Sequence, residues 1–185
     1  MRKSIFWLNR EDMTEKTCYD SYPFWIVLLS NVVAIAIYAA GAFVIHKIGW
    51  IWLIIYILYI IGLEIRLLRS SCVNCYYYGK ACAFGKGKLS CLFFKKGDTN
   101  RFKQDKITWK DIAPDFLVSL IPIVAGVILL IIDFNWLLLS MVLIVIILTF
   151  LGNGLIRGSL ACKYCKQREI GCPAEQLFNR DKTQA

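Results

Sequence analysis

Four long apolar segments set the organisation of the chain. They are Pro23–Ile45, Ile48–Leu63, Phe116–Ile132 and Phe134–Ile156, and none contains a charged residue. A helix needs about 20 apolar residues to cross a bilayer core, within a range of about 17–25, so the second segment must continue through residues 64–68. Few amphipathic helices are present to cover such segments in a soluble protein. We therefore predict an all-α integral membrane protein with four transmembrane helices.

Composition agrees with this pattern. The chain is 58% hydrophobic yet carries a formal net charge of +9 over 185 residues, which is typical of apolar spans separated by basic loops. The first segment follows 22 mostly polar residues and is longer than a typical signal-peptide core, so we expect an anchor rather than a cleaved signal. The basic loops are expected to face the lipid bilayer, and nothing indicates a nucleic acid partner.

The distribution of basic residues predicts the orientation. An even number of spans places both termini on one side, and only Lys47 of the 22 lysines and arginines lies on the other. The positive-inside rule then assigns the N-terminus, the central loop and the C-terminus to the cytoplasmic side of the cell membrane.

The predicted organisation is two tandem helical hairpins, each followed by a cytoplasmic cysteine loop. Asp-x-x-Pro precedes the first and third spans, at Asp20 and Asp111, which favours an internal parallel repeat over chance similarity of two apolar hairpins. The parts are a cytoplasmic N-terminal segment (1–22), a first transmembrane hairpin (23–68), a basic cytoplasmic loop (69–114), a second transmembrane hairpin (115–157) and a cytoplasmic tail (158–185).

Two cysteine motifs carry the candidate chemistry. "CVNCYYYGKAC" (72–82) and "CKYCKQREIGC" (162–172) share the spacing Cys-x2-Cys-x6-Cys and little else. All eight cysteines fall in segments expected to be cytoplasmic, where thiols are kept reduced, so metal binding or redox chemistry is favoured over structural disulfides. The candidate ligands are Cys18, Cys72, Cys75, Cys82, Cys91, Cys162, Cys165 and Cys172.

Each motif supplies three thiols, whereas zinc or a four-iron cluster usually takes four. Cys91 is the candidate fourth ligand of the first motif, and Cys18 could complete the tail's set if the first and fourth helices are neighbours. The only histidine, His46, lies at the opposite end of its helix. Two separate sites result, and the choice between an iron–sulfur cluster and zinc stays open.

Three classes of function remain open. The first is a membrane protein that binds metal for electron transfer or metal handling, with a cytoplasmic or membrane redox partner. The others are a small transporter or scaffold with structural zinc clips, and a membrane thiol–disulfide oxidoreductase. The sequence shows no Ser/His/Asp set or nucleotide-binding glycine loop that would indicate an enzyme.

Two further features bear on the site. The tyrosines at 76–78 fit an aromatic belt at the headgroup level. Glu64, near the cytoplasmic end of the second span, is expected to pair with Arg157 across the bundle.

Overall fold

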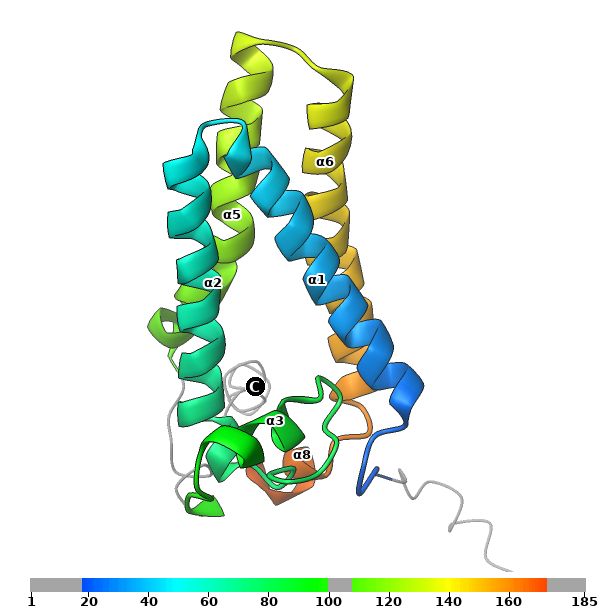
Figure 1. The fold of residues 1–185 in the computed structure, drawn as a ribbon. Helices are drawn as coiled ribbons and strands as arrows, with labels where there is room; N and C mark the ends of the chain where they lie inside the picture. Colours follow the sequence, from blue (N-terminus) through cyan, green and yellow to red (C-terminus); the bar gives the residue numbers. More distant parts are fainter. Residues whose placement is uncertain (1–17, 100–107, 173–185) are drawn as a thin grey trace, which may run out of the picture.

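A computed structural model describes residues 18–99 and 108–172, and this part of the chain is predominantly helical (Figure 1). Four of its helices are long and apolar enough to cross a membrane: Phe24–His46, Trp50–Asn74, Lys110–Ile132 and Trp136–Ala161. The all-helical class and the four candidate spans predicted from the sequence are confirmed. With the eight cysteines, these helices support a multi-pass membrane protein.

The elements follow the order of the apolar segments. They are α1 (Phe24–His46), α2 (Trp50–Ser70), η2 (Cys72–Asn74), α3 (Lys86–Phe93), α5 (Trp109–Ile132), α6 (Trp136–Ile147), η3 (Leu148–Gly152), α7 (Asn153–Leu155), η4 (Ile156–Ala161) and α8 (Lys166–Gly171). The second span does continue past Leu63, to Ser70, which gives it the length that a bilayer crossing needs. The fourth continues from α6 through η3, α7 and η4 to Ala161.

Local chemistry explains where the last two long helices begin. Thr108 precedes α5, and its backbone N–H donates to the Asp111 carboxylate at 2.9 Å. Asn135 precedes α6, and its side-chain oxygen accepts from the Leu137 backbone N–H at 2.8 Å. Side chains of this type satisfy N–H groups that the first turn of a helix leaves without partners.

Helix α1 is the central element of the bundle because it packs against α2, α5 and α6. Val44 of α1 is buried with Leu138 and Val142 of α6, whereas Ile45 is buried with residues of α2 and α5. The first and fourth spans are therefore neighbours, as the predicted role of Cys18 requires. Most other large apolar side chains on the long helices face outward, which suits contact with lipid.

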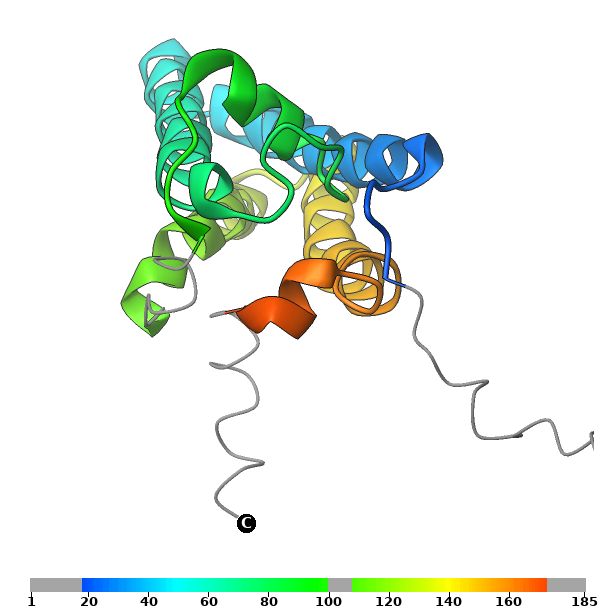
Figure 2. The ribbon, with the colours of Figure 1, turned by 90° about the horizontal axis from the view of Figure 1, so that it is seen from below.

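The cysteine motifs and the start of α1 lie at one end of the bundle, which we call the cysteine end (Figure 1). Figure 2 looks at this end and shows α3 beside α1 and α2, with α8 following the end of the fourth span. Three chain segments far apart in sequence therefore meet there.

Candidate thiol centre

The two cysteine motifs are in direct contact with each other. The Tyr76 backbone N–H donates to the Gln167 side-chain oxygen at 2.7 Å, across 91 positions of sequence. The Lys166 backbone N–H donates to the Tyr77 hydroxyl at 3.0 Å. Both distances lie within the usual range for hydrogen bonds. The motifs thus form one assembly at the cysteine end.

The segment before α1 joins both motifs. Tyr19 forms an isolated parallel β-bridge with Cys165, and its backbone N–H donates to the Tyr164 carbonyl at 3.0 Å. Its own carbonyl accepts from the Tyr77 hydroxyl at 2.6 Å. The Tyr22 backbone N–H donates to a carbonyl of the first motif at 2.8 Å. Residues 19–22 therefore contact both motifs and connect the first loop to the tail.

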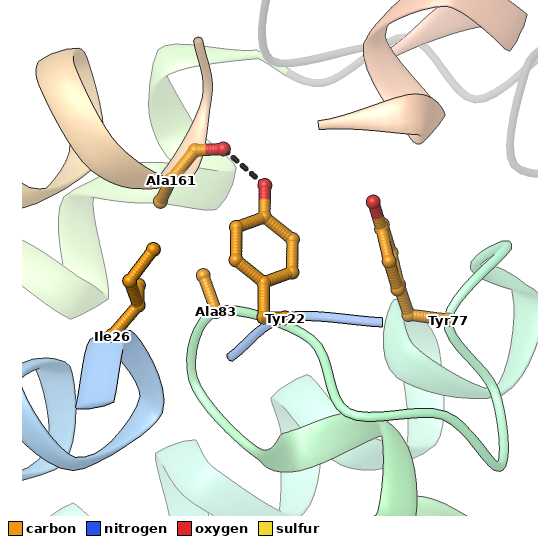
Figure 3. Packing of buried hydrophobic residues seen from close by; sticks show 5 residues of the cluster. All are labelled: Tyr22, Ile26, Tyr77, Ala83 and Ala161. Atoms are coloured by element: carbon orange, nitrogen blue, oxygen red, sulfur yellow. Dashed lines mark hydrogen bonds between the residues drawn. The ribbon is translucent and has the colours of Figure 1, made fainter. Parts of the chain in front are cut away.

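A small apolar core supports this junction. Tyr22, Ile26, Tyr77, Ala83 and Ala161 are buried together, and Figure 3 shows the Tyr22 ring between Ile26 and Tyr77, with its hydroxyl donating to the Ala161 carbonyl. Three cysteines pack against this core, and they come from both motifs: Cys75, Cys82 and Cys165. These three thiols thus pack against buried side chains of the junction.

Cys75 connects the two motifs, and we call Cys75 and its three thiol neighbours the central set. Cys75 interacts electrostatically with Cys82 of its own motif and with Cys165 and Cys172 of the tail. Cys165 and Cys172 interact with each other in the same way. These four are the second and third cysteines of each motif, so the two halves of the chain contribute equivalent positions.

Two further thiols flank this set. Cys72 interacts with the other two thiols of its motif, and Cys162 with the other two of the tail motif. Cys162 is exposed, whereas Cys72 is half-buried.

Cys18 and Cys91, the expected fourth ligands, lie in different surroundings. Cys18 interacts with Cys165 and donates from its sulfur to the Glu169 carboxylate at 3.0 Å, so it lies beside the tail motif, as the sequence predicts. Cys91 is exposed on α3, and its sulfur lies against Tyr78 and Gly79. The geometry therefore associates Cys18 with the junction and places Cys91 at the surface of the first loop.

Burial raises the pKa of two thiols at the junction, one from each motif. It raises the pKa of Cys75 to about 11, and it also raises the pKa of Cys165. In both cases a neighbouring thiol raises the pKa further, because two adjacent thiolates repel. Thiols with raised pKa are protonated near neutral pH, whereas the reactive thiols of disulfide oxidoreductases have lowered pKa values.

Among the described residues, no three His, Cys, Asp or Glu side chains are placed as ready ligands around one point. A backbone donor is already in place, since the Gly87 N–H points to the Cys82 sulfur at 3.4 Å. The backbone at Gly87 thus approaches a sulfur closely.

Glu64 has a different partner from the expected one. Its carboxylate pairs with the Lys86 ammonium at 2.7 Å and accepts from the Tyr38 hydroxyl at 2.8 Å. Arg157, the expected partner, instead lies over the Phe84 ring, 5.3 Å from its centroid. The reason is that the first loop folds back onto α1 and α2 and brings Lys86 to Glu64.

Sequence reasoning missed the residues that build the junction. Tyr77 was assigned to an aromatic belt, yet it is buried and its hydroxyl joins Tyr19 to Lys166. Gln167 is also buried, which is unusual for glutamine and is explained by its bond to Tyr76. No local signal distinguishes these residues from surface ones, because their partners lie in remote parts of the chain.

Comparison with known protein families, curated proteins and solved structures finds no match. The geometry of the junction is therefore the basis for a functional proposal.

Proposed function

We propose that this is a membrane protein that binds metal through both cysteine motifs together and acts in electron transfer or metal handling. The metal is an iron–sulfur cluster held by Cys75, Cys82, Cys165 and Cys172. The observation that carries the proposal is the position of Cys75 beside thiols of both motifs, on a shared buried core.

Ligand number supports one shared centre. A four-iron cluster and a structural zinc ion each take four thiolates. Two cysteines from each motif supply these four ligands, so no other residue is needed. This differs from the two separate sites expected from the sequence, which needed Cys91 for the first motif. The proposed centre takes the second and third cysteines of each motif, which are equivalent positions in the predicted tandem-hairpin repeat.

The surroundings suit a bound cluster. Four thiolates with an oxidised four-iron cluster carry a charge of about −2, and hydrogen bonds to the sulfurs and limited solvent exposure tune such a centre. The Gly87 N–H and the tyrosine core provide both. With the basic segments in the cytoplasm, the centre faces a cytoplasmic or membrane redox partner.

A second candidate is a small transporter or scaffold in which zinc clips the segments together. The observation that favours it is the junction itself, because residues 19–22, the first motif and the tail motif are joined there. A closed four-thiolate zinc site would stabilise such an arrangement.

Metal analysis of the full chain tests the proposal. After anaerobic purification in detergent, we expect about four iron and about four sulfide per chain, with broad visible absorption that is lost on oxidation. One zinc per chain without colour would support the structural clip instead. Folded protein with neither metal would contradict both candidates.

A further inference from the structure

The outward face of α3 carries three large apolar side chains, together with Lys88 and Cys91. Leu89, Leu92 and Phe93 are 43%, 77% and 70% exposed. The inward face is formed by Gly87 and Ser90, which are buried against the first cysteine loop. A helix of eight residues with such a division of faces has one side that is poorly suited to water.

Contacts at the start of α3 fix its depth relative to the long helices. The Phe84 carbonyl accepts from the Asn31 side chain of α1 at 3.3 Å, and Lys86 pairs with Glu64 of α2. Asn31 lies seven residues from the start of α1, and Glu64 lies six residues from the end of α2. At 1.5 Å per residue, these two contacts lie about 9–11 Å inside the ends of the two helices.

Glu64 is the first charged residue of α2, and Arg66 and Arg69 follow it. The contact with Lys86 therefore lies where α2 passes from apolar to charged residues, which is the boundary between acyl chains and headgroups if α2 crosses a bilayer. Figure 2 shows α3 at the outer edge of the bundle, beside α1 and α2, rather than under its centre.

The lysines near α3 also suit a position at the membrane interface. Lys88 of α3 is exposed, and so are Lys95 and Lys96, which follow the end of the helix. Lysines bordering an apolar helical face are typical of helices that lie in the membrane interface and attract anionic lipid.

We propose that α3 is an interfacial membrane helix that anchors the first cysteine loop to the bilayer surface. Leu89, Leu92 and Phe93 enter the boundary between headgroups and acyl chains. Lys88, Lys95 and Lys96 contact anionic headgroups, phosphatidylglycerol being the test lipid. The inference needs the bundle to lie in a membrane but does not depend on what the thiols bind.

Photo-crosslinking tests the position of the apolar face. The full chain carries benzoylphenylalanine at position 92 or, as the control, at the exposed position 163 of the tail, in vesicles of phosphatidylcholine and phosphatidylglycerol. We expect lipid adducts at 92 and none at 163, as read by mass spectrometry. Crosslinks from 92 to a second copy of the chain, or equal yields of lipid adduct at the two positions, would overturn the proposal.

Spin-labelled lipids test the charged part. The wild-type chain should retain phosphatidylglycerol at its surface in preference to phosphatidylcholine, and a variant with Lys88→Gln, Lys95→Gln and Lys96→Gln should lose most of that preference. The matched variant with arginine at the same three positions should keep it, because the charge is conserved. Equal preference in the glutamine variant and the wild type would show that these lysines do not bind anionic lipid.

Discussion

Serine in place of Cys75 or Cys165 is expected to remove the same bound metal from the protein, although the two residues belong to different motifs. Each thiol lies in the central set and packs against the shared core. Loss of a ligand should weaken metal binding by at least about 10- to 100-fold, the effect of removing only a hydrogen-bonding partner of a ligand. Metal per chain after anaerobic purification and desalting is the measurement.

Serine at Cys72 or Cys162 provides the matched control. Each is the first cysteine of its motif, lies next to the central set and undergoes the same chemical change. We expect both variants, and Cys91→Ser, to keep most of their metal. If Cys72→Ser and Cys75→Ser removed one half of the metal, and Cys162→Ser and Cys165→Ser the other half, the two-site arrangement would be correct.

Alanine in place of Gly87 is expected to disrupt the first motif. A methyl group there would overlap the backbone carbonyl oxygens of Tyr77 and Lys80, closer than real Cβ contacts come. Backbone atoms cannot rotate away, so α3 must shift from the loop, and the N–H contact to the Cys82 sulfur is lost with it. We expect destabilisation by about 1–3 kcal/mol, the usual range for overpacking, together with a fall in metal content.

Gly62→Ala is the control for this substitution. Gly62 lies within α2, and a methyl group there would meet nothing within 4 Å. The change should be neutral or slightly stabilising, because alanine favours a helix over glycine. Thermal unfolding in detergent compares the two variants. Equal stability and metal content in Gly87→Ala and Gly62→Ala would show that close packing at Gly87 is not needed.

The sequence predicted what depends on local pattern. Four apolar runs indicated the four candidate spans, and the length deficit after Leu63 correctly indicated a continuation of the second helix. The neighbour relation between the first and fourth spans followed from general rules of helical bundles. These features are predictable because the apolar and polar residues along a helix indicate which environment the helix occupies.

The junction could not be predicted because it depends on contacts between remote segments. Nothing near Tyr77 indicates that its hydroxyl will meet Tyr19 and Lys166, and nothing near Glu64 indicates Lys86. Spacing within a motif predicts that its thiols are neighbours. It carries no information on whether two such motifs face each other, which is what placed Cys75 beside Cys165.

The central claim is that the two motifs meet at one centre, and thiol crosslinking in the folded chain tests it most directly. Protein stripped of metal is treated with a short bifunctional maleimide, digested and analysed by mass spectrometry. The account predicts crosslinked peptides that join the segment containing Cys75 and Cys82 to the segment containing Cys165 and Cys172. Crosslinks confined to cysteines of the same motif, at comparable overall yield, would contradict it.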